Sequence, residues 1–192
     1  MIEEILGLPA HPLFVHAPIV LVPLFILLSV GYAVVPRWRA QLGWAVVILA
    51  VVTPSVVYVT RLSGEALQQR LAARDFLPPE LAADVNAHAA HSLRLLWFTV
   101  GLAVAALLLT LVGRMLRTLD RMARSEGGGP DDRAASEGQA ASEGQAALSR
   151  RRSNLVVVAI VLALVVIGLG AASGWYLYQT GDSGARMVWE GM

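Results

Sequence analysis

The sequence predicts an all-α integral membrane protein: a single membrane domain over residues 1–192 that forms a four-transmembrane-helix bundle with a helical loop on the outer side. Hydrophobic residues make up 56% of the chain and charged residues only 15%, which is outside the range of soluble domains. Four apolar runs are long enough to cross about 30 Å of hydrocarbon as helices. They cover about residues 13–35, 43–59, 93–112 and 155–178.

The first run contains Pro18 and Pro23. A helix in a bilayer tolerates proline when neighbouring helices satisfy the freed carbonyl groups, so we expect a kink near its start. A secretory signal peptide would begin with basic residues, whereas Glu3 and Glu4 precede this run. We therefore expect a transmembrane helix here and not a cleaved signal.

The arginines set the expected orientation, because short cytoplasmic loops are rich in positive charge. Ten of the 15 basic residues fall in the connections between the first and second spans and between the third and fourth spans. We predict that these two connections are cytoplasmic and that the N- and C-termini lie outside. All basic residues are arginine, and the chain is rich in Ala, Gly and Val, which is typical of a GC-rich bacterial genome. The expected location is the bacterial cell (inner) membrane.

The two long connections differ in character. The inner one, 125–149, contains a glycine run and the sequence Ala-Ser-Glu-Gly-Gln-Ala twice, which predicts a disordered cytoplasmic linker. In the outer one, residues 65–74 after Ser63-Gly64 predict a short amphipathic helix. Pro79 suits the first turn of a further helix that continues into the third span.

Composition excludes several functions. Without cysteine the chain forms no disulfide, no cysteine-ligated iron–sulfur cluster and no thiolate zinc site. A net charge of +1 without basic clusters on ordered segments argues against nucleic acid as a partner. The predicted partner is the lipid bilayer.

The four histidines are the most informative polar residues. His11 and His16 precede or open the first span, and His88 and His91 precede the third, so all four are expected at the outer face. Neutral imidazole binds transition metals and is an axial ligand of b-type haem, and histidines on facing helices of a bundle hold such cofactors. His88 and His91 share a helix face, whereas residues five apart on a regular helix point roughly 140° away from each other. We therefore expect His16 and His88 to be the main ligands, ahead of His91 and His11. The alternative is that these histidines are polar anchors at the headgroup level.

Two carboxylates could also take part in a metal site with the histidines. A mixed metal site would combine His16 and His88 with Asp182 and Glu65, and Asp182 could instead orient a histidine from a glycine-flanked turn. Arg94 is expected to pair with Glu65 or Asp182. The Gly170–Gly174 spacing permits close helix approach, which we interpret as packing within the chain, with homodimer formation as the alternative.

The segment 7–19, Gly-Leu-Pro-Ala-His-Pro-Leu-Phe-Val-His-Ala-Pro-Ile, resembles the HPxxVHxPI opening of a family of small bacterial predicted membrane proteins of unknown function. The four spans, the histidines before the third span and the Gly-Asp-Ser-Gly-Ala ending at 181–185 followed by Trp189 fit the same resemblance. It implies a haem- or metal-binding redox protein, some of whose relatives are joined to iron–sulfur electron-transfer domains. Where many relatives are expected to carry a histidine in the ending, this chain has Asp182, which favours a mixed His/carboxylate site.

The main functional hypothesis is therefore an integral membrane protein that binds haem b or a divalent transition metal near the outer face and exchanges electrons with a redox partner protein there. The alternative is a non-catalytic assembly or interaction subunit without a cofactor. Transport is disfavoured because the spans hold almost no ionisable residues and the two halves show no clear repeat. Hydrolysis is disfavoured because Ser63 and Ser183 lack a strand-to-helix elbow, so we predict no catalytic residue.

The predicted orientation can be tested by cysteine labelling, since the natural chain has no cysteine. We expect a cysteine at Ala73 to react with an impermeant thiol reagent on intact cells and a cysteine at Gly128 to react only after the membrane is opened. Labelling of Gly128→Cys but not Ala73→Cys on intact cells would reverse the orientation.

Overall fold

The computed structural model describes residues 4–5, 8–126 and 137–189. A pair of two-residue antiparallel strands opens the described chain, with β1 at Glu4–Ile5 and β2 at Leu8–Pro9. Helices follow, in the order α1 Ala10–Phe14, α2 His16–Val34, the 3-10 turn η1 Pro36–Trp38, α3 Arg39–Ala73, α4 Pro79–Glu126 and α5 Glu137–Trp189.

The predicted all-α membrane fold is confirmed. Among the described residues, four helical segments are long and apolar enough to cross a membrane. Three of the predicted spans lie within one of them, and the first, 13–35, ends one residue past Val34. Large apolar side chains such as Leu27, Trp44 and Leu164 are more than 60% exposed on the outside of the bundle. Because water would solvate these side chains poorly, this outer surface is suited to contact the lipid bilayer.

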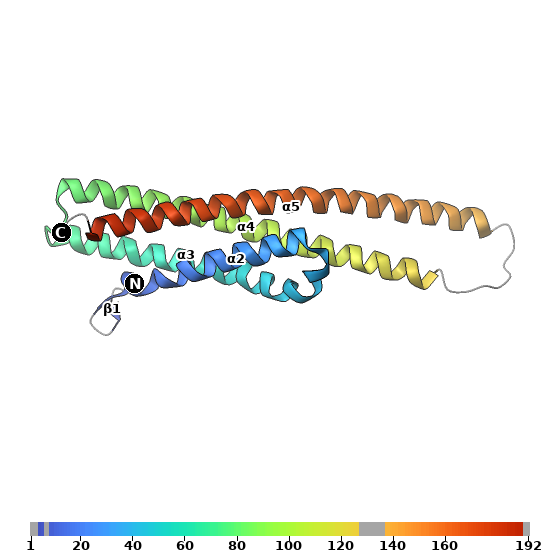
Figure 1. The fold of residues 1–192 in the computed structure, drawn as a ribbon, viewed down its shortest axis with the longest axis horizontal. Helices are drawn as coiled ribbons and strands as arrows, with labels where there is room; N and C mark the ends of the chain where they lie inside the picture. Colours follow the sequence, from blue (N-terminus) through green and yellow to red (C-terminus); the bar gives the residue numbers. More distant parts are fainter. Residues whose placement is uncertain (1–3, 6–7, 127–136, 190–192) are drawn as a thin grey trace.

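The four long helices pack as a ring in the order α2, α3, α4, α5, with α5 also contacting α2 (Figure 1). Side chains from all four meet on the axis of the bundle. The largest buried ones include Phe25 and Tyr32 of α2, Val46 of α3, Leu102 of α4 and Val166 of α5. Tight packing of these groups holds the helix ends in fixed relative positions.

The start of the first span is nearly continuous. Helix α1 ends at Phe14 and α2 begins at His16, but Val15 between them has helical φ and ψ angles of −60° and −25°, and its N–H bonds to the carbonyl oxygen of His11 at 3.1 Å. At the opposite end of α2, Arg39 donates from Nε to the carbonyl oxygen of Tyr32 at 3.1 Å and from Nη2 to that of Ala33 at 3.0 Å. These bonds satisfy carbonyl groups of the last turn of α2 and close the connection to α3.

The separate helix predicted for 65–74 is wrong, because α3 runs without a break through Ser63 and Gly64 to Ala73. A single glycine costs a helix only about 1 kcal/mol, and burial of Ser63 and Ala66 against the bundle compensates. The third helix does begin at Pro79, as predicted. Between the two helices the chain turns through Asp75, whose φ is 58°.

Helices α4 and α5 extend beyond α2 and α3 at the end opposite the α3–α4 turn (Figure 1). Asp120 and Arg152 form an ion pair at 2.9 Å between these extensions. Here the structure differs from the predicted linker at 125–149, because 137–149 is helical and belongs to α5. Alanine, glutamate and glutamine favour helix, and the segment continues directly from an apolar helix, which accounts for the difference. Residues 127–136 of the predicted linker lie outside the described residues.

The glycines of α5 pack within the chain. A Cβ atom added at Gly170 would lie 3.2 Å from Cγ2 of Ile26 in α2, and one added at Gly174 would lie 3.8 Å from Cδ1 of the same residue. Gly168 is exposed, and a Cβ there would meet nothing within 4 Å. The glycine at 170 therefore allows α2 and α5 to approach closely.

This difference predicts the effects of two substitutions on the same helix. Gly170→Leu should reduce the free energy of unfolding by about 1–3 kcal/mol, because the larger side chain overpacks the α2–α5 contact. Gly168→Leu should cause no loss and should raise the free energy of unfolding by up to about 1 kcal/mol, because its side chain extends into open space and glycine is a poor helix former. Thermal unfolding in detergent, followed by circular dichroism, measures both. A greater loss for Gly168→Leu would mean that its face is packed.

Candidate functional site

A cavity of about 640 Å³ lies at the end of the bundle that holds α1 and the C-terminal turns of α5. Residues of α1, α2, α3, α4 and α5 all contribute to its wall. Much of the wall is apolar, with Val57, Leu71, Leu81, Leu95 and Leu177 among the contributing residues. Its size is that of a small-molecule or cofactor site, which typically measures about 300–1,000 Å³.

His11 enters this cavity from α1 and is held by α3. Its Nδ1 lies 3.1 Å from the carbonyl oxygen of Thr60 and 3.0 Å from Oγ of Ser63. The Ser63 hydroxyl donates its only proton to the same carbonyl oxygen at 2.7 Å, so its oxygen is left to accept. Both neighbours of Nδ1 are therefore acceptors. The neutral ring must carry its proton on Nδ1, which leaves a free lone pair on Nε2.

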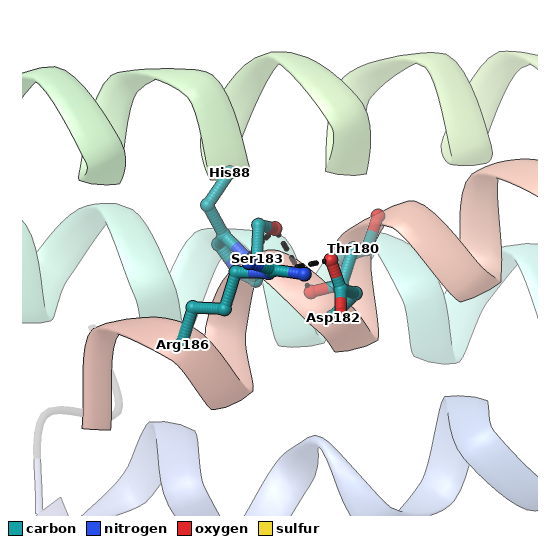
Figure 2. Close-up of polar contacts among 5 residues, drawn as sticks. All are labelled: His88, Thr180, Asp182, Ser183 and Arg186. Carbon is teal, nitrogen blue, oxygen red and sulfur yellow. Dashed lines mark hydrogen bonds and ion pairs between the residues drawn. The ribbon is translucent and has the colours of Figure 1, made fainter. Parts of the chain in front are cut away.

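His88 of α4 makes the same contacts with α5. Its Nδ1 lies 3.0 Å from Oγ of Ser183, and that hydroxyl donates to the carbonyl oxygen of Thr180 at 3.1 Å. Figure 2 shows the His88 ring extending from α4 to Ser183 on α5. The ring also interacts with the backbone carbonyl of Thr180, which can only accept, so the neutral form with its proton on Nδ1 and a lone pair on Nε2 matches both neighbours.

The two histidine-binding segments have the same sequence pattern. Residues 58–64 are Tyr-Val-Thr-Arg-Leu-Ser-Gly and residues 178–184 are Tyr-Gln-Thr-Gly-Asp-Ser-Gly, so both read Tyr-x-Thr-x-x-Ser-Gly. A Cβ atom at Gly64 would lie 3.0 Å from Cε1 of His11, and one at Gly184 would lie 3.3 Å from Cε1 of His88. A side chain at either position would crowd the ring, so glycine leaves room for it. This short pattern recurs near the end of the second helix of each half, within a sequence that otherwise shows no clear repeat.

The two rings lie close together. The ring centroids of His11 and His88 are 6.5 Å apart and the ring planes are inclined at 88°. Two positive imidazolium rings at this separation beside an apolar cavity would repel each other strongly. The arrangement therefore favours a pair of neutral rings, each with its unprotonated nitrogen available.

The structure reverses the predicted order of the N-terminal histidines. His16 also lines the cavity but is exposed, whereas His11 is half-buried and lies beside His88. Residues five apart lie on different faces of a helix, and the face that carries His11 is the one that contacts Thr60 and Ser63 of α3. His91 is half-buried but is not part of the cavity wall, and its Nδ1 is buried without a hydrogen-bond partner among the described residues.

The predicted carboxylates take other partners. Glu65 lines the cavity and accepts from Arg61 of the same helix at 2.6 Å. Asp182 pairs with Arg186 at 2.9 Å and is not part of the cavity wall (Figure 2). Arg94 was expected to pair with one of these acids, but it lies over the ring of Tyr176, 5.9 Å from the centroid.

The predicted mixed metal site requires two histidines and two carboxylates to surround one ion. Within the described part of the chain, no three or more His, Asp or Glu side chains are placed to hold a metal ion together. The combination of His16, His88, Asp182 and Glu65 is thus not brought together around one point.

The fold and site define a multi-pass membrane protein with a pair of histidines at one end of a helical bundle. A family model described as "Predicted membrane protein (DUF2231)" matches residues 7–192. The chain belongs to this family, which confirms the resemblance expected from the opening motif. No curated protein and no solved structure matches the chain significantly.

The hydrogen bonds at both rings predict one protonation form. In protein labelled with ¹⁵N-histidine in detergent micelles at neutral pH, we expect His11 and His88 to show a protonated Nδ1 and an unprotonated Nε2. His11→Gln and His88→Gln variants assign the signals, and His16→Gln provides the control because His16 is exposed. A protonated Nε2 at either ring in cofactor-free protein would contradict the hydrogen-bond directions.

Proposed function

We propose that this membrane protein binds b-type haem between His11 and His88 and acts as an electron carrier. The observation that carries the proposal is the pairing of two imidazoles, 6.5 Å apart, whose Nδ1 atoms are each held by a Tyr-x-Thr-x-x-Ser-Gly segment. Histidines that bind metals commonly donate their other N–H group to a carbonyl or a similar acceptor, which fixes the ring orientation.

The ring separation is consistent with two axial ligands of one iron. Imidazole nitrogen binds a transition metal at about 2.0–2.1 Å, and the ring centroid lies about 1.2 Å behind that nitrogen, so two opposed rings have centroids about 6.5 Å apart. The observed separation between His11 and His88 has this value.

The number of ligands favours haem over a bare ion. A structural or catalytic zinc-type site takes three or four protein ligands. Haem supplies four equatorial nitrogens itself and requires only axial ligands from the protein. In the described part of the chain no third His, Asp or Glu is grouped with His11 and His88 so that the three could hold one metal ion, which suits a haem that needs only axial ligands. The apolar wall of the cavity also suits a porphyrin, because it removes a large hydrophobic surface from water.

Bound haem would supply one-electron chemistry. The residues of this chain would orient the histidines and control the access of water to the site. Thr60 and Ser63 hold His11, while Thr180 and Ser183 hold His88. The surrounding apolar side chains limit access of water to the site. From the arginine distribution, we place the site at the outer face of the bacterial cell membrane, where a redox partner protein would exchange electrons with it. We expect both termini to lie on this face as well.

The proposal predicts a spectrum that depends on two histidines. Protein purified in mild detergent should show a Soret band, with about one haem per chain and a low-spin iron. His11→Ala or His88→Ala should remove the low-spin spectrum and most of the haem, because one axial bond is lost. His16→Ala and His91→Ala are the matched controls and should retain it.

Elemental analysis of the same samples separates the alternatives. Full haem retention in a folded His11→Ala/His88→Ala variant would reject the site. A stoichiometric metal without a Soret band would favour the ion site, and the absence of both in protein purified from haem-replete cells would favour the assembly subunit without a cofactor.

A further inference from the structure

The two copies of the histidine-binding segment differ in the residues that face the cavity. In the first copy the cavity wall includes Arg61 and Glu65, whereas Gly181 and Ala185 stand at the matching positions of the second copy. Gln68, one turn further along α3, also lines the cavity. The histidine pair is therefore similar on both sides, but the polar side chains are concentrated on the α3 side.

Arg61 has an unused hydrogen-bond donor. One terminal nitrogen of its guanidinium, Nη2, pairs with Oε1 of Glu65 at 2.6 Å. Its Nε is buried and has no hydrogen-bond partner among the described residues. A buried donor without a partner is unfavourable, and such groups usually bond to a ligand, an ion or water. The side chain as a whole is 24% exposed, so the guanidinium lies at the boundary of the cavity.

We propose that Arg61 binds a carboxylate of the molecule that occupies the cavity and so fixes its orientation. Resting on the proposed function, this molecule is haem, an apolar disc with two propionates on one edge. Arginine forms charge-assisted and often bidentate hydrogen bonds to carboxylates, and Nε contributes one of the donors. The acidic edge then lies toward α3, and the apolar edge lies toward Gly181 and Ala185 of α5.

Glu65 weakens the proposed interaction between Arg61 and a haem propionate. Its carboxylate already accepts from Arg61 and neutralises part of the positive charge that a propionate would meet. Removing the charge of Glu65 while keeping its size should therefore strengthen carboxylate binding, whereas removing the charge of Arg61 should weaken it. A merely structural Arg61–Glu65 pair would instead give the same result for both substitutions.

The test compares haem b with haem b dimethyl ester, in which both propionate charges are removed. Protein produced without haem is titrated in detergent micelles, and the Soret band measures the affinity for each porphyrin. Wild-type protein should prefer the free diacid by about 10- to 100-fold, the range of one charge-assisted hydrogen bond. Arg61→Gln should abolish most of this preference and leave the low-spin spectrum, because both histidines remain. Glu65→Gln should increase the preference.

Arg94→Gln is the control, because Arg94 lies over Tyr176 and is not part of the cavity wall. It should retain the wild-type preference. A low-spin haem spectrum with the same preference in wild type, Arg61→Gln and Glu65→Gln would overturn the role of Arg61 and leave the histidine site intact. If neither porphyrin gives a Soret band with wild-type protein, the proposed function fails, and the role of Arg61 fails with it.

Discussion

The structure of the site depends on one hydrogen-bonding constraint: each serine of the repeated segment uses its single proton on a threonine carbonyl oxygen. The serine oxygen then accepts, and with a threonine carbonyl also beside each ring the matching neutral form of the histidine donates from Nδ1. Near a bilayer a polar group without a partner is costly, so this arrangement satisfies the serines and both Nδ1 groups at once. Its consequence is that the unprotonated nitrogens of His11 and His88 are left for a ligand.

The helices are arranged so that this constraint can be met twice. Helices α3 and α5 continue past their apolar spans, and the repeated segments lie on these extensions. Gly64 and Gly184 leave room for the rings. His11 lies on the short helix α1 and contacts α3, whereas His88 lies within the long helix α4 and contacts α5. The two histidines thus reach the same cavity from different local structures. The two halves of the chain share the histidine ring and its hydrogen-bond partners, whereas the backbone that carries the ring differs.

Much of the fold could be predicted from the sequence, because a long apolar run can form few structures other than a helix in a bilayer. The four spans and the start of α4 at Pro79 followed from length and proline position. The choice between His11 and His16 could not, since it depends on which face of the first helix packs against α3. The serine and threonine partners were missed because four shared residues at a separation of 120 positions give a weak repeat. They could have been found by aligning the ends of the second and fourth spans.

The central claim is that His11 and His88 are axial ligands of one haem, and the electron paramagnetic resonance spectrum of the oxidised protein tests it most directly. The ring planes are inclined at 88°, and near-perpendicular imidazoles give low-spin ferric haem a highly anisotropic signal. We expect this signal in wild-type protein and its loss in His11→Ala. A high-spin signal in wild type, or a low-spin signal that persists unchanged in His11→Ala, would contradict the account.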